Sequence, residues 1–222
     1  MIRKLLALVL VAIVIVPCFA QAAETQPVQL ALFNPVQIVP EGESIKGMRL
    51  SIFYSVNNEV SGLDFAWLGV NKTSGDMSGV GIGLGNWVVG NAYGGQVGLV
   101  NHAGKRCVGI QYGFANVVEG DFTGLQWGLV NWTEGSMRGI QGGIVNVSKG
   151  QSRGVELGVV NYNDGVIKGL QAGFVNYAKE VHGLQLGIVN CTSNLDGLQI
   201  GIGNYNGNKK PMEFMALLNW SF

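Results

Sequence analysis

The stretch Gly124-Leu-Gln-Trp-Gly-Leu-Val-Asn131 decides the fold, because the chain repeats it almost unchanged. The copies that follow are Gly139-Ile-Gln-Gly-Gly-Ile-Val-Asn146, Gly154-Val-Glu-Leu-Gly-Val-Val-Asn161, Gly169-Leu-Gln-Ala-Gly-Phe-Val-Asn176, Gly183-Leu-Gln-Leu-Gly-Ile-Val-Asn190 and Gly197-Leu-Gln-Ile-Gly-Ile-Gly-Asn204. Self-similarity at a fixed short period is the signature of a repeat architecture. We therefore treat the chain as an array of one short unit.

The asparagine that closes each unit recurs at a constant spacing from Asn71 to Asn219, apart from two steps that are one residue shorter. Weaker copies toward the N-terminus extend the array to about 13 units, with no change of composition that would mark a linker. The repeat predicts a single all-β domain over residues 23–222. The structural repeat positions are Asn86, Asn101, Asn116, Asn131, Asn146, Asn161, Asn176, Asn190, Asn204 and Asn219.

Residues within a unit alternate with the period of a β-strand. One predicted face carries Leu125, Trp127 and Leu129, and the other carries Gly124, Gln126, Gly128 and Val130. Dipeptides such as Glu134-Gly135 follow each unit and are turn signals. A helix is excluded, because each interior glycine would cost about 1 kcal/mol. We expect one strand and one glycine-containing turn per unit.

Two architectures fit this pattern. In an antiparallel meander each turn is a hairpin and the sheet closes as a β-barrel, whereas in a β-solenoid each unit is one coil that stacks on the next. The nearly constant repeat length favours the solenoid, because closing a barrel requires tilted strands with a staggered register. A solenoid would be about 60 Å long, at about 4.8 Å per coil.

The C-terminus favours the barrel. Apolar residues alternate at Phe214, Ala216, Leu218, Trp220 and Phe222, and this pattern resembles the closing strand of bacterial outer-membrane barrels, which typically ends on phenylalanine. The resemblance implies a membrane-assembly signal at Phe214, Leu218, Trp220 and Phe222. We therefore take the barrel as the main prediction and the solenoid as the alternative.

Residues 1–22 predict a cleaved secretory signal. Two basic residues, Arg3 and Lys4, precede an unbroken apolar run from Leu5 to Val16, and Ala20-Gln-Ala22 is a small-x-small cleavage site. A lipoprotein signal that uses Cys18 is the rival interpretation. Either one predicts an exported protein.

Two sets of polar side chains carry open interpretations. The repeat asparagines form either a hydrogen-bonded ladder or a ligand site, and the glutamines either line a polar lumen or stack as an amide ladder. Aromatic residues share the position after the asparagine, where they form an interfacial girdle or pack at strand ends. These aromatic residues are Trp87, Trp132, Tyr162, Tyr177 and Tyr205.

The sequence does not predict an enzyme, a cofactor or a metal site. The formal net charge is zero, which argues against nucleic acid as a partner. His102 and His182 occupy different repeat positions without a ligand cluster around them. Cys107 and Cys191 lie far apart in the chain at different points of the repeat, and the sequence leaves open whether they are ever oxidised.

At the level of the unit G-[LIV]-Q-x-G-[LIVF]-V-N, residues 28–222 resemble a group of bacterial exported surface-repeat proteins. The resemblance implies a location in the cell envelope or at the surface and carries no catalytic residue to transfer. We expect a non-enzymatic outer-membrane barrel, structural or weakly pore-forming, in contact with outer-membrane lipid. The alternative is a surface-exposed or periplasmic solenoid that acts as a binding or scaffold module.

Overall fold

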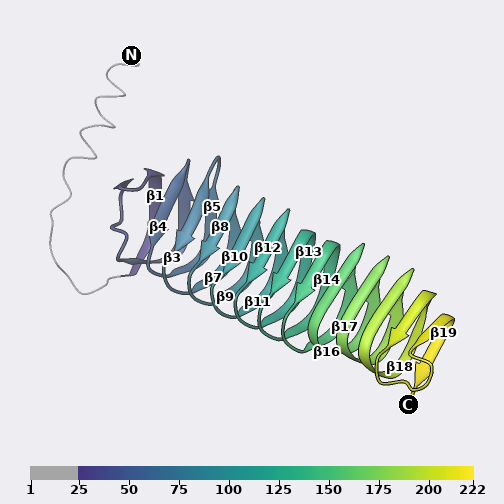
Figure 1. Ribbon diagram of the computed structural model, residues 1–222. Helices are drawn as coiled ribbons and strands as arrows, with labels where there is room; N and C mark the ends of the chain where they lie inside the picture. Colours follow the sequence, from purple (N-terminus) through teal and green to yellow (C-terminus); the bar gives the residue numbers. More distant parts are fainter. Residues whose placement is uncertain (1–24) are drawn as a thin grey trace, which may run out of the picture.

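The computed structural model describes residues 25–222, which form a β-solenoid of about 12 turns. The coils stack into an elongated rod with β1 near one end and β19 at the other (Figure 1). The secretory signal predicted at residues 1–22 lies outside the described residues. Within residues 25–222, no helix has the length and apolar character needed to cross a membrane.

All regular elements in the described part of the chain are strands, which confirms the predicted all-β repeat. Their bounds are β1 Thr25–Phe33, β2 Val36–Gln37, β3 Ser44–Ser51, β4 Tyr54–Asn57, β5 Val60–Ala66, β6 Val70–Thr73, β7 Met77–Ile82, β8 Gly85–Val88, β9 Ala92–Val97 and β10 Val100–Ala103. The remaining strands are β11 Cys107–Tyr112, β12 Ala115–Val118, β13 Phe122–Thr133, β14 Met137–Ser148, β15 Ser152–Leu157, β16 Val160–Ala172, β17 Val175–Leu186, β18 Val189–Asn206 and β19 Phe214–Ser221.

Each coil bends twice, whereas the sequence predicted a single strand and one turn. In one coil β11 and β12 are separated by a corner at Gly113-Phe114, and the turn at residues 119–121 leads to the next coil. The corner also reverses the facing parity, so Val130 is 40% exposed although alternation predicted that it shares the face of Gln126. Two bends per unit return the chain to its starting direction, and this closes a coil.

Neighbouring coils are parallel and in register. Gln111 lies opposite Gln126 and Asn116 opposite Asn131, so equivalent repeat positions stack directly on one another. This confirms the alternative prediction of a solenoid and shows that the meander and the barrel were wrong. The physical reason is the near-constant period, since identical coils stack without the stagger that barrel closure demands.

Two rows of amides fill one half of the interior. From Asn71 to Asn190 each repeat asparagine donates from Nδ2 to Oδ1 of the next one, as Asn101 does to Asn116 at 2.8 Å. Most glutamines of the second row donate from Nε2 to Oε1 of the preceding one, as Gln126 does to Gln111 at 2.8 Å. These side chains are buried, so the ladder interpretation of both rows holds.

The other half of the interior, next to the turns, is mainly apolar. One buried cluster runs through successive coils and another occupies the C-terminal coils. The first cluster contains Met77, Val88, Ala92, Ala103, Cys107, Val118, Phe122 and Met137, and the second contains Ile167, Ala178, Val181 and Leu195.

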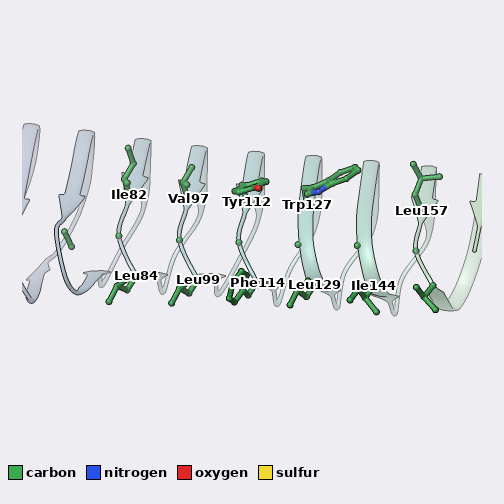
Figure 2. A pocket seen from close by; sticks show the side chains of 18 of the residues that line it. Ile82, Leu84, Val97, Leu99, Tyr112, Phe114, Trp127, Leu129, Ile144 and Leu157 are labelled. Atoms are coloured by element: carbon green, nitrogen blue, oxygen red, sulfur yellow. The ribbon is translucent and has the colours of Figure 1, made fainter.

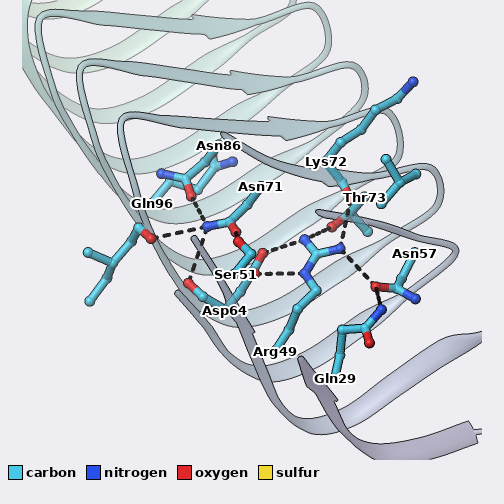
Figure 3. Close-up of polar contacts among 12 residues, drawn as sticks. Gln29, Arg49, Ser51, Asn57, Asp64, Asn71, Lys72, Thr73, Asn86 and Gln96 are labelled. Atoms are coloured by element: carbon cyan, nitrogen blue, oxygen red, sulfur yellow. Dashed lines mark hydrogen bonds and ion pairs between the residues drawn. The ribbon is translucent and has the colours of Figure 1, made fainter. Parts of the chain in front are cut away.

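An ion pair between Arg49 and Asp64 interrupts the interior row in the N-terminal coils, where Gln29 precedes it (Figure 3). Arg49 lies opposite Asp64 in the same interior row, and both side chains are buried. The guanidinium donates from Nε to Oδ1 at 2.7 Å and from Nη2 to Oδ2 at 2.6 Å, and Nη1 donates to the Lys72 carbonyl at 2.7 Å. The bidentate geometry satisfies a charge pair that would otherwise be costly to bury.

The C-terminal strand caps the rod. β19 pairs antiparallel with β18, with Trp220 opposite Leu198 and Leu218 opposite Ile200. Phe214, Leu218, Trp220 and Phe222 are 42–95% exposed, so the alternating apolar residues lie on an end cap instead of closing a barrel. A cap of this kind covers the last coil's hydrogen-bonding edge.

Candidate functional site

The corners of successive coils form a continuous row of exposed apolar side chains. Their exposed fractions lie between 42% and 68%, although large apolar side chains are usually buried. The corner row consists of Leu84, Leu99, Phe114, Leu129, Ile144, Val159, Phe174, Ile188 and Ile202.

Apolar positions also flank the corner on both sides. Two rows precede the corner, one running from Val80 to Leu198 and the other from Ile82 to Ile200. A third row follows the corner and runs from Gly85 to Gly203. We call these three rows together with the corner row the apolar stripe. No position in the stripe carries a charged or amide side chain. Contiguous exposed apolar surface of this extent marks an interaction site, because soluble monomers rarely show patches above a few hundred Å².

A groove of about 990 Å³ runs along the stripe. Its two walls are the corner row and the row that contains Ile82, Val97, Tyr112, Trp127 and Leu157, as Figure 2 shows. The polar side-chain atoms in the lining are limited to the Tyr112 hydroxyl and the indole nitrogens of Trp67 and Trp127. The lining therefore favours an apolar ligand.

Glycines make the floor of the groove. A Cβ added to Gly128 would lie 2.2 Å from the carbonyl oxygen of Gly113, and one added to Gly143 would lie 2.0 Å from that of Gly128. The Asn116 and Asn131 amides lie behind the same positions, 2.8 and 3.0 Å from the added atoms. Only glycine allows the coils to stack this closely, because a side chain here would collide with the preceding coil and the buried asparagine row.

Backbone N–H groups along the groove are already hydrogen-bonded to neighbouring coils. Gly98 N donates to the Tyr112 carbonyl at 3.0 Å, and Leu99 N donates to the Leu84 carbonyl at 2.9 Å. A bound peptide would lose water from its own carbonyls without gaining a donor from these N–H groups. The groove therefore fits hydrocarbon better than an extended peptide.

Charged residues gather at the opposite edge, in and beside the turns between coils. Lys149 Nζ lies 2.9 Å from Glu134 Oε1, and Arg106 Nη2 lies 3.9 Å from Asp121 Oδ2. The cross-section is therefore amphipathic, with one apolar edge and one charged edge.

Aromatic residues line one boundary of the stripe. The side chains that follow the repeat asparagine point outward from the shorter strand segment, between the stripe and the charged turns. We call this row, which includes Trp87, Trp132, Tyr162, Tyr177 and Tyr205, the aromatic row. Trp87 stacks on His102 with ring centroids 3.9 Å apart, Tyr162 stacks on Tyr177 at 5.0 Å, and Lys149 lies over Trp132. The outward position fits a girdle, and the stacking between neighbouring coils fits packing at strand ends, so both interpretations stay open.

Comparisons with family models, curated proteins and solved structures gave no match. The resemblance to surface-repeat proteins therefore stays a prediction.

The predicted repeat asparagines fall into two places. Asn86 through Asn204 form one buried row, whereas Asn219 lies opposite Gln199 and donates to its Oε1 at 2.9 Å. Spacing alone placed Asn219 with the others, and it missed that the last strand runs antiparallel. Each Asn Nδ2 also donates to a carbonyl behind the groove wall, as Asn101 does to Tyr112 O at 3.0 Å.

Sequence reasoning missed the stripe itself. The period-2 pattern identified a bulky face, but it could not show that the corner turns this face outward at one edge of every coil. The recurrent Gly-[LIVF] pair, such as Gly113-Phe114 or Gly128-Leu129, was the available signal, since glycine at a bend lets the chain turn.

The cysteines and histidines do not form a site. Burial raises the pKa of the Cys107 thiol to about 12, and Cys191 lies in the outward aromatic row, so the two thiols are in different layers. His102 Nε2 lies 3.1 Å from Glu119 Oε1, and His182 Nδ1 lies 2.9 Å from Asp196 Oδ2. Among residues 25–222, no three side chains of the metal-binding types come together.

Proposed function

We propose that the protein is a non-enzymatic module of the cell envelope that lies on a lipid bilayer through its apolar stripe. The observation that carries the proposal is the amphipathic cross-section, in which the coils present apolar side chains at one edge and most of them carry charges at the other. The predicted secretory signal and the resemblance to surface-repeat proteins support export, with the outer membrane as the lipid surface.

A bilayer fits the stripe in three respects. The corner side chains from Leu84 to Ile144 follow one another in a line, so several corners reach one plane together (Figure 2). Backbone N–H groups at the corners, such as those of Leu99 and Phe114, are bonded to the preceding coil and are not donors for a peptide. Tryptophan and tyrosine at the boundary match the preference of these residues for the membrane–water interface.

Vesicle flotation tests the proposal. The mature chain, residues 23–222, is mixed with neutral phosphatidylcholine vesicles and centrifuged through a density gradient. A variant with Leu99→Glu, Leu129→Glu and Phe174→Glu places three carboxylates on the stripe. The matched control carries Ser136→Glu, Gln151→Glu and Ser193→Glu on the charged edge, which changes the net charge equally.

We expect the wild type and the control to float and the stripe variant to lose at least about tenfold in vesicle affinity, because a charge in the acyl region is costly. Flotation of the stripe variant equal to the control would contradict the proposal. The proposal would also fail if the wild type did not float and formed a dimer that the stripe substitutions dissociate. The stripe would then be an interface between two copies of the chain. Circular dichroism of each variant checks that the fold is retained.

A further inference from the structure

Three cations stack on one another beside the apolar stripe. Arg138 lies opposite Arg153, and Arg153 lies opposite Lys168, in three successive coils. All three side chains are exposed and point outward from the longer strand segment. Neighbouring members are about 4.8 Å apart at the backbone. We call these residues the basic row.

The basic row has no counter-charge. Among the ion pairs and side-chain hydrogen bonds of residues 25–222, none involves these three residues. The acid at the far end of the same row, Asp196, bonds His182 instead. Like charges placed directly opposite one another destabilise a sheet, so the fold alone does not explain this arrangement.

The basic row adjoins the stripe on the side opposite the aromatic row. Ile140, Val155 and Leu170 follow two residues after the three cations, and each belongs to the stripe. Two residues of strand span about 6–7 Å. When the stripe lies in the acyl region, the cations therefore lie at the depth of the lipid headgroups.

We propose that the basic row binds the phosphate groups of anionic lipids and so fixes how the rod lies on the membrane. This inference rests on the proposed function, and it names the lipid class that the module prefers. Arginine suits the role because its planar guanidinium binds phosphate oxygens in pairs. The strand spacing of about 4.8 Å lets one phosphate bridge two neighbouring cations.

The experiment compares neutral phosphatidylcholine vesicles with phosphatidylcholine vesicles in which about a third of the lipid is replaced by phosphatidylglycerol. The test variant is Arg138→Gln, Arg153→Gln and Lys168→Gln. The matched control is Lys105→Gln, Arg106→Gln and Lys179→Gln, which removes the same charge from the turn edge. That edge lies more than a Debye length from the membrane, so its charges are screened.

We expect the wild type to bind the anionic vesicles more tightly than the neutral ones. The test variant should lose this preference by about a hundredfold, which is roughly fivefold for each cation at the surface. The control should lose less than about tenfold, and all three proteins should bind neutral vesicles equally.

The outcomes separate the two proposals. Absence of wild-type binding to neutral vesicles overturns the proposed function, whereas equal anionic binding by the test variant and the control overturns only this inference. A third arm adds millimolar inorganic phosphate without vesicles. Phosphate could raise the melting temperature of the wild type but not of the test variant, while the wild type shows no preference for anionic vesicles. This result would mean that the row binds free anions, and the lipid assignment would fail.

Discussion

Individual asparagine side chains in this interior make two kinds of hydrogen bond, one to the next asparagine and one to a backbone carbonyl. A repeat asparagine such as Asn131 donates to the next asparagine at 2.8 Å and to the Gly142 carbonyl at 2.9 Å, so it links two coils and fixes the backbone behind the groove. Buried amides need such partners, because an unsatisfied one costs about 1–3 kcal/mol. Asparagine at this position therefore stabilises each coil from Asn71 to Asn204, whereas Ser55 occupies the row in the preceding coil.

Glu156 interrupts the glutamine row, because it places a carboxyl group between the amides of Gln141 and Gln171. It accepts from Gln171 Nε2 at 2.7 Å and from Asn163 Nδ2 at 3.2 Å, but a carboxylate cannot donate onward to Gln141 as a glutamine would. Burial raises the pKa of Glu156 above its ordinary value of 4.5, against hydrogen bonds from Gln171, Ser152, Asn163 and Ser148 that lower it.

The raised pKa makes stability depend on pH. The contribution of a protonated Glu156 is fully present below its unfolded pKa and is lost as pH rises through the higher folded pKa. We expect Glu156→Gln to be about 1–3 kcal/mol more stable than the wild type near pH 8 and about equal to it near pH 4, because the amide completes the row. Urea unfolding across this range measures the difference.

The exposed Glu59→Gln substitution is the control for this measurement. It should leave the free energy of unfolding nearly unchanged at every pH. A Glu156→Gln variant that is less stable than the wild type at pH 8 would mean that the hydroxyl and amide donors around the carboxylate outweigh its desolvation.

At the scale of elements, the last strand is the one open to pairing with a strand of another molecule. β19 pairs with β18 on one side only, so its other edge presents unpaired backbone groups. Lys209 lies across this edge, where Nζ donates to the Trp220 carbonyl at 2.7 Å and to Asn219 Oδ1 at 3.0 Å and lies 4.7 Å from the centre of the Trp220 ring. The lysine therefore blocks the addition of another strand.

Lys209→Ala should promote end-to-end association of rods. The free energy of unfolding should fall by less than about 1 kcal/mol, because exposed charged contacts contribute little. Sedimentation velocity at increasing concentration should show larger species than in the wild type. Lys210→Ala, which removes only the contact with Glu213, is the control, and equal sedimentation of the two variants would show that Lys209 does not guard the edge.

At the scale of the whole molecule, the sequence predicted the repeat, its strand character and the stacking of equivalent residues in one of two architectures. It could not choose between them, because a unit of this length closes as a coil only if it bends twice. The second bend, at Gly113-Phe114 and its equivalents, is marked only by a Gly-[LIVF] pair, which is a weaker signal than the X-Gly dipeptides of the other turn. The alternating residues of β19 misled the prediction, since the same apolar alternation serves an end cap. The stripe and the basic row emerge only once equivalent residues of successive units are placed side by side.

Deletion of one complete coil tests the whole architecture. Removing residues 109–123 joins Val108 to Gly124, so every interior row continues with the same residue types: Gln96 meets Gln126, and Asn101 meets Asn131. Because the stability of a solenoid is nearly a sum over neighbouring coils, we expect a folded, slightly shorter rod with an unchanged far-ultraviolet spectrum per residue and a modestly lower melting temperature. Removing only residues 109–115 shifts the register and would place outward apolar residues inside, so this variant should not fold. Tolerance of both deletions, or of neither, would show that direct stacking of equivalent positions is not what holds the rod together.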